Sequence, residues 1–139
     1  MLTLKNEVDE PYCIVKLITD AKAVLIEWQD ATKTSQVEIA ASKIQEIVKE
    51  NNTEDIISDF RKCKKFDQEA SEFLNTTFYP ELSTSGVSKH AIIFSEEVFK
   101  RIMKKSFCRF YSGYFDVEVF KEFSDALNWL QKKYVKSAS

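Results

Sequence analysis

Alternating apolar and polar residues near the start of the chain predict a β-hairpin. Tyr12 to Thr19 is rich in β-branched and apolar residues, and Asp20-Ala21 provides a tight turn. From Ala23 to Trp28 the residues alternate between two faces, with Val24, Ile26 and Trp28 on one face and Glu27 on the other. Residues 1–11 are short, acidic and end at a proline, so we expect a loose N-terminal lead-in there.

Helical spacing then alternates with short apolar runs. The first helix is expected from a cap at Thr34 or Ser35, with Ser35 and Glu38 as a capping box, to Asn51-Asn52. A strand follows at Ile56–Phe60. A second helix is expected over residues 67–78, stopped by Pro80.

The last third of the chain repeats this pattern. Lys89–Phe94 ends in a continuous apolar run, typical of a strand covered on both faces. Ser95 can cap a third helix, Phe115–Val119 alternates as a fifth strand, and Ser124 can cap a last helix.

The predicted order ββαβαβαβα indicates an α/β fold. A hairpin followed by strand–helix repeats implies a mixed, mainly parallel sheet of about five strands covered by helices. We expect a single domain over residues 12–136, because 139 residues suffice for one hydrophobic core.

Composition narrows the function. The chain has 11 Phe, 5 Tyr and 2 Trp, which fit either a dense core or an aromatic-lined pocket for a lipid or other apolar small molecule. Only 2 Gly occur, which excludes the glycine-rich loops that bind nucleotide phosphates. The sequence contains no pair of carboxylates spaced for acid–base catalysis and no set of residues with metal-ligand spacing. No cofactor is expected.

Charge and cysteine content indicate a cytoplasmic protein. The net charge of −2 argues against nucleic acid as the partner, and no stretch approaches the roughly 20 apolar residues of a membrane span. Cys13, Cys63 and Cys108 are isolated from one another, which fits a reducing compartment and neither a disulfide framework nor a zinc site.

The most informative stretch runs from Asp55 to Leu74, where a strand, a basic turn and a helix start follow one another. Free backbone N–H groups converge at such junctions, so the turn can bind an acidic partner or a phosphate. The alternative is a solvated turn whose acids only stabilise the helix start. The candidate contacts are Asp59, Arg61, Lys62, Cys63, Lys65, Asp67 and Glu69.

Cys63 and the basic, aromatic residues over 100–114 each have a functional and a structural interpretation. Cys63 lies among cations, but thiol catalysis also needs a base, and nothing in the sequence places His90, the single histidine, beside it. No enzyme activity is therefore expected. The basic and aromatic residues over 100–114 could bind an anionic lipid head group or nucleic acid, or form a solvated helix exterior.

The element order, the break after Asp59 and the closing stretch Phe120–Leu130 resemble the STAS domain of SpoIIAA-like anti-sigma-factor antagonists, a family of small bacterial regulatory proteins. The family carries an Asp-Ser-Ser/Thr-Gly segment whose hydroxyl is phosphorylated by a partner kinase. The resemblance places Asp67 at the motif's aspartate, Glu69 at the phosphoacceptor and Ala70 at the glycine. Both hydroxyls are absent, so this phosphorylation switch is not expected here.

The resemblance implies a non-catalytic, cytosolic regulatory module that binds a protein partner through the loop after the third strand and the second helix. A domain that binds a lipid or apolar small molecule is the alternative.

Overall fold

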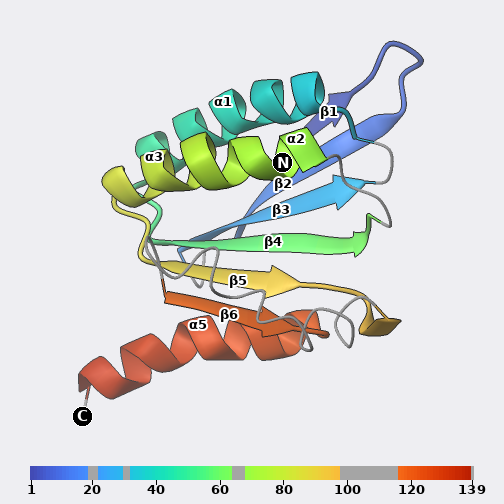
Figure 1. Cartoon of the computed structure of the whole chain (residues 1–139). Helices are drawn as coiled ribbons and strands as arrows, with labels where there is room; N and C mark the ends of the chain where they lie inside the picture. Colours follow the sequence, from blue (N-terminus) through green and yellow to red (C-terminus); the bar gives the residue numbers. More distant parts are fainter. Residues whose placement is uncertain (19–21, 30–31, 64–67, 98–115, 139) are drawn as a thin grey trace.

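A computed structural model describes residues 1–18, 22–29, 32–63, 68–97 and 116–138. They form a six-stranded sheet with helices against both faces (Figure 1). The strands lie in the order in which they occur along the chain: β1 (Leu2–Lys5), β2 (Pro11–Ile18), β3 (Ala23–Gln29), β4 (Asp55–Lys62), β5 (Lys89–Ile93) and β6 (Asp116–Phe120). The pairs β1–β2 and β2–β3 are antiparallel, whereas β3–β4, β4–β5 and β5–β6 are parallel. The predicted mixed, mainly parallel α/β sheet is confirmed.

The direction of the crossover connections determines which face of the sheet each described helix covers. They are α1 (Thr34–Asn51), α2 (Gln68–Phe73), the π-helix η2 (Leu74–Phe78), α3 (Tyr79–Thr84) and α5 (Phe123–Ala138). The connections β3–α1–β4 and β4–α2–η2–α3–β5 both step the same way along the sheet. Crossovers of one hand then bring their helices to the same face. Figure 1 shows α1, α2 and α3 on one face and α5 on the other.

Each face of the sheet buries its own set of apolar side chains. The larger core lies under α1 and α2–α3 and includes Val24, Ile26, Trp28, Ile56 and Ile92. The smaller core lies under α5 and combines strand residues with Ala126 and Leu130, and its buried strand residues are Ala23, Leu25, Ile57, Ala91 and Ile93. The prediction that β5 is covered on both faces is therefore confirmed.

The β2–β3 hairpin forms as expected, although its predicted turn at Asp20-Ala21 lies outside the described residues. The alternation along β3 is also confirmed, because Trp28 faces the larger core and Glu27 the opposite side. Leu25 is nevertheless buried on that opposite side.

The segment predicted as a loose lead-in contains a strand. β1 pairs with β2 through the register Leu2↔Val15 and Leu4↔Cys13. Leu2 and Leu4 alternate with Thr3, and both leucines pack against the larger core. The acidic residues that suggested a free segment lie in the β1–β2 loop instead, where Asn6 Oδ1 accepts hydrogen bonds from the N–H groups of Val8 and Glu10.

Helix α1 begins two residues earlier than the predicted capping box of Ser35 and Glu38 requires. Its N-cap residue is Lys33, and Gln36 Oε1 accepts a hydrogen bond from the Lys33 N–H at 2.9 Å. Gln36 therefore has the role assigned to Glu38, and Ser35 lies inside the helix. The predicted box of Ser35 and Glu38 is therefore wrong. The pairs Lys33/Gln36 and Ser35/Glu38 have the same three-residue spacing, so spacing alone could not distinguish them, and packing of the apolar helix face decides at which residue the helix begins.

The prediction that Pro80 stops the second helix is also wrong. Helical residues continue from Gln68 to Thr84, and the turn before the proline is a π-helix in which the Tyr79 N–H bonds to the Leu74 carbonyl. Proline lacks an N–H and collides with the carbonyl four residues earlier in a regular α-helix. The wider π turn changes the hydrogen-bond spacing at that point, so the chain can pass Pro80 without leaving the helix.

The remaining predicted elements agree in part. Helical residues do follow Ser95, at Glu96 and Glu97, but the rest of the predicted third helix and the basic–aromatic cluster lie outside the described residues. The fifth predicted strand corresponds to β6, and the last helix to α5, which begins at Phe123, so Ser124 lies inside the helix and does not cap it. Across the parts of the chain that the structure covers, no helix is long and apolar enough to span a membrane.

Candidate functional site

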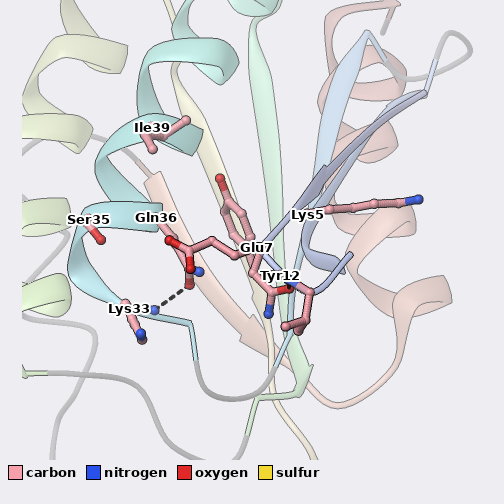
Figure 2. A pocket seen from close by; sticks show the side chains of 9 residues that line it. Lys5, Glu7, Tyr12, Lys33, Ser35, Gln36 and Ile39 are labelled. Carbon is pink, nitrogen blue, oxygen red and sulfur yellow. Dashed lines mark hydrogen bonds between the residues drawn. The ribbon is translucent and has the colours of Figure 1, made fainter. Parts of the chain in front are cut away.

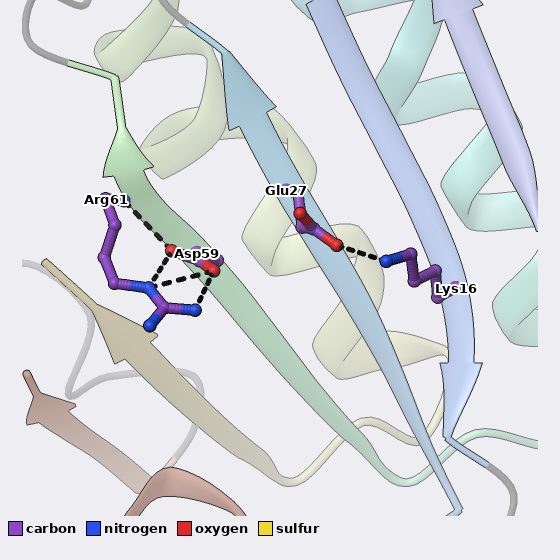
Figure 3. Close-up of polar contacts among 4 residues, drawn as sticks. All are labelled: Lys16, Glu27, Asp59 and Arg61. Carbon is purple, nitrogen blue, oxygen red and sulfur yellow. Dashed lines mark hydrogen bonds and ion pairs between the residues drawn. The ribbon is translucent and has the colours of Figure 1, made fainter. Parts of the chain in front are cut away.

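Four charged side chains from β2, β3 and β4 form a row across one face of the sheet, with Asp59 and Arg61 at the carboxyl end of β4 (Figure 3). We call Lys16, Glu27, Asp59 and Arg61 the charged row. Glu27 and Asp59 are direct neighbours in the parallel pairing of β3 with β4. They share the face of the sheet that carries Leu25 and Ile57, because alternate residues of a strand point the same way. Ligand sites in α/β proteins usually lie at this end of parallel strands.

Asp59 fixes the position of the Arg61 side chain. The Arg61 Nε donates to Asp59 Oδ1 at 3.0 Å, and a terminal guanidinium nitrogen donates to Oδ2 at 2.8 Å. The Arg61 backbone N–H also donates to Oδ1 at 3.0 Å. These hydrogen bonds, with weaker help from the charges of Glu122 and Glu27, raise the pKa of Arg61 against the opposing effect of burial. A bidentate pair of this kind holds the guanidinium plane in one orientation.

Exposure within the charged row differs between acids and bases. The side chains of Asp59 and Glu27 are only 10% and 15% exposed, whereas those of Arg61 and Lys16 are 40% and 43% exposed. Lys16 Nζ lies 2.9 Å from a Glu27 carboxylate oxygen. The two carboxylates are thus covered, and the row presents its cations to the surroundings.

The other predicted contact residues divide into three groups. Lys62 and Glu69 are exposed, at the end of β4 and the start of α2. Lys65 and Asp67 lie outside the described residues. Cys63 is buried within the larger core and is not a surface contact, contrary to the prediction. Its backbone N–H bonds to the Phe60 carbonyl, and this turn brings the residue back toward the core.

Aromatic side chains follow the same end of the sheet on the opposite face. The Phe60 ring stacks on Trp28 and on Phe94, with centroids 6.4 Å and 5.4 Å apart. Trp28 is 1% exposed and Phe94 is 8% exposed. Trp28 and Phe94 belong to the larger core, and Phe60 packs against it.

A buried polar contact lies deeper in the larger core. The Ser58 hydroxyl and His90 Nε2 share a hydrogen bond of 2.7 Å between β4 and β5, and the His90 ring lies 4.9 Å from the Tyr79 ring. Burial lowers the pKa of His90 to about 3, so the imidazole is neutral. His90 was predicted to be a structural hydrogen-bonding group, and its partner Ser58 could not be read from the sequence because it depends on strand pairing.

Cys13 is a second buried cysteine of the larger core. Burial, reinforced by the charge of Glu27, raises the pKa of Cys13 to about 12, so its thiol stays protonated at neutral pH. Within the described ranges no group of three or more His, Cys, Asp or Glu side chains could hold a metal ion.

Lys16 and Glu27 are site residues that the sequence did not single out. Each looks like an ordinary solvent-facing residue of a hairpin, and only the register of β2, β3 and β4 brings them beside Asp59. The alternation along β3 does put Glu27 on the correct face, which is the one signal available in advance.

Comparison with protein families places most of the chain in a known domain family. The model of a family described as domain of unknown function (DUF7793) matches residues 18–134. A search of the curated proteins found no match. The matched range covers most of the chain and includes β3 to β6 with the helices between them. The chain therefore belongs to the family described as domain of unknown function (DUF7793).

Proposed function

We propose that this protein is a non-catalytic regulatory module that binds a protein partner through the end of β4 and the start of α2. The observation that carries the proposal is the fixed, half-exposed guanidinium of Arg61, next to the exposed Lys62. A cation that is already held in place loses little conformational freedom on binding. Arginine is also among the residues that most often dominate the energy of protein interfaces.

The chemistry of the surface favours an acidic partner. Arg61 and Lys62 are the exposed groups at the strand end, while Asp59 is covered and acts by holding Arg61. A carboxylate of the partner could take the guanidinium edge that Asp59 leaves unused. Lys65, which the sequence places three residues after Lys62, would add a further cation to the same contact.

The resemblance to anti-sigma-factor antagonists supports the same surface. In that family the loop after the third strand, which corresponds to β4 here, and the following helix contact the partner. In this chain the corresponding helix start carries the exposed Glu69 in place of a phosphorylated hydroxyl. We therefore propose that binding is not controlled by phosphorylation at this position, and that the protein acts in the cytoplasm as a constitutive binding partner.

The proposal is tested by affinity capture from the source cells. The tagged wild type is compared with the double variant Arg61→Glu/Lys62→Glu and with a matched control, Lys43→Glu/Lys49→Glu, which reverses two exposed cations on α1. We expect one or more specific proteins that the wild type and the control capture and the double variant loses. Equal capture by all three proteins would contradict the proposal, provided that circular dichroism shows all three folded.

A further inference from the structure

The two outer strands of the sheet, β1 and β6, differ in the charge of their side chains. β6 contains the exposed acids Asp116 and Glu118, and such charges keep a second strand from pairing with an open edge. In β1 the residues Leu2–Leu4 are uncharged, and the first charge is at Lys5. Within the described structure no strand pairs with the outer edge of β1. β1 is therefore the edge at which another strand can be added.

The side chains of β1 are only partly covered. Leu2 and Leu4 pack against the larger core but keep part of their surface exposed. Thr3 lies between them and points to the opposite face, because successive side chains of a strand alternate. The backbone N–H and C=O groups of alternate residues point away from β2 at such an edge. An added strand would pair with these groups and cover the two leucines further.

Exposed apolar side chains gather around the same edge. Met1, directly before β1, is 89% exposed, and Val8, in the β1–β2 loop, is 71% exposed. Ile39 on α1 is 53% exposed and lies across a hollow from that loop (Figure 2). These three belong to the four exposed large hydrophobic residues of the described structure, the other being Leu17. Apolar side chains that gather in one area of the surface mark an interaction site.

This apolar area spans two layers of the molecule, which decides what can cover it. Ile39 belongs to the helix layer, whereas Met1 and β1 belong to the sheet. A single extended peptide would cover the strand edge and leave Ile39 exposed. A second copy of this chain would bring its own α1 to the same height above the sheet. A two-fold axis perpendicular to the sheet keeps the helices of both copies on one face and uses the same surface of each.

We propose that two copies of this chain pair through β1, antiparallel and about a two-fold axis at Thr3, to form one continuous sheet. Leu2 would lie opposite Leu4 of the second copy on the side of α1, and the two Thr3 side chains would be neighbours on the other side. An axis at Lys5 would oppose two like charges, whereas an axis at Thr3 places Lys5 opposite Met1 and pairs the whole strand. This inference goes beyond the proposed function, because it concerns another surface and a second copy.

The expected dimer is weak. A standard interface buries roughly 800 Å² on each partner, and a short strand edge with a few apolar side chains covers less than that. We therefore expect a dissociation constant in the micromolar range, so that dilute protein is monomeric and concentrated protein is dimeric. Sedimentation velocity over a series from about 10 to about 500 μM measures this equilibrium. A monomer throughout the series would overturn the proposal.

The position of the axis is tested by disulfide crosslinking. In the proposed dimer the two copies of residue 3 are opposite each other, with Cα atoms about 4.5–5.5 Å apart, which a disulfide can bridge. Thr3→Cys should therefore form a covalent dimer under mild oxidation. Lys5→Cys is the matched control, because the two copies of residue 5 would be about 13 Å apart along the strands. Wild type, oxidised in parallel, shows what the native cysteines contribute. Equal crosslinking of Thr3→Cys and Lys5→Cys would contradict this pairing.

Charge variants at the axis separate loss of pairing from loss of folding. Thr3→Lys and Thr3→Glu each place two like charges opposite each other, so each should raise the dissociation constant of its own dimer several-fold. An equal mixture of the two variants places opposite charges together and should restore dimer formation to about the level of wild type. Restored pairing would also show that both variants are folded. A mixture that dimerises no better than either variant alone would overturn the proposal.

Discussion

Asp59 and Arg61 contribute unequally to stability because they are buried to different extents. Asp59 is covered by its neighbours, whereas Arg61 is half-exposed. If the pair is broken, water can therefore replace much of the interaction that the Arg61 guanidinium loses. Removing the arginine leaves a covered carboxylate without its cation, while Asp59→Asn keeps the shape and removes the charge.

We therefore expect Arg61→Gln to lower the free energy of unfolding by about 1–3 kcal/mol, and Asp59→Asn to lower it less. Urea unfolding followed by circular dichroism measures both values. Lys62→Gln is the control, since Lys62 is exposed and should change stability by no more than about 0.5 kcal/mol. Equal effects of Arg61→Gln and Lys62→Gln would contradict this account of the pair.

His90 predicts a specific pH dependence. Burial lowers its pKa in the folded state to about 3, whereas the unfolded chain has the ordinary value of 6.5. The unfolded state thus binds a proton first as the pH falls. The stability that the neutral imidazole contributes is complete above pH 6.5 and is lost between pH 6.5 and about 3, by at most about 1.4 kcal/mol per pH unit.

Because His90 is the single histidine, its imidazole signal in a proton NMR spectrum needs no assignment. We expect the signal of the folded protein to keep its position from pH 7.5 down to pH 5, and that of the urea-unfolded protein to titrate near 6.5. A midpoint near 6.5 in the folded protein would show that the ring is accessible to water.

Sequence reasoning brought Asp59, Arg61 and Lys62 together near the end of one strand, but it placed Arg61 and Lys62 in a turn, whereas they are the last residues of β4, and it could not supply their geometry. The side-chain pairing of Asp59 with Arg61 and the approach of Glu27 depend on strand register, which alternating apolar residues leave open. Cys63 shows the opposite error. Its cationic neighbours suggested exposure, while the backbone turn to Phe60 buries it.

At the scale of elements, helices and strands were predicted correctly where the apolar repeat is long. The predictions failed at the ends of helices and for a short strand. α1, β3 and α5 were located because their apolar faces repeat over several turns or residues. The helix after β4 was ended too early, since a proline normally breaks an α-helix and a π turn that accommodates it has no sequence signature of its own. β1 was missed because a four-residue strand is too short to show alternation.

The start of α1 offers a test at this scale. Lys33 is an unfavourable N-cap residue, because it gives the first N–H groups no acceptor and places a positive charge at the positive end of the dipole. We expect Lys33→Asp to raise the free energy of unfolding by about 0.5–2 kcal/mol in thermal or urea unfolding. Ser35→Asp is the comparison, because Ser35 lies in the first turn, where an acid meets the helix dipole but supplies no N-cap acceptor, and its gain should be smaller, about 0.3–1 kcal/mol. A larger gain from Ser35→Asp would contradict the N-cap assignment.

For the whole molecule, the distribution of charge along the chain determines how strongly it attracts an approaching charged partner. Residues 1–59 carry 6 Lys/Arg and 12 Asp/Glu, whereas residues 60–139 carry 14 and 10. The half of the chain that begins at the end of β4 is therefore basic. An acidic partner approaching Arg61 and Lys62 would be attracted over a distance that salt shortens.

The affinity for the captured partner should accordingly fall as salt rises from 50 to 300 mM, by roughly tenfold, chiefly through slower association. Surface plasmon resonance with the purified partner measures this dependence. In Arg61→Glu/Lys62→Glu the remaining affinity should change little with salt. A salt dependence of the same steepness in wild type and variant would place the electrostatic contact elsewhere on the surface.

The central claim is that the end of β4 touches a protein partner, and site-specific crosslinking in living cells tests it most directly. A photo-crosslinking phenylalanine analogue is placed at Lys62 and, as the matched control, at Lys43, which is also exposed and lies on α1. We predict a discrete adduct of higher mass from position 62 after irradiation, and none of that mass from position 43. Absence of an adduct at position 62, or the same adduct at both positions, would contradict the account.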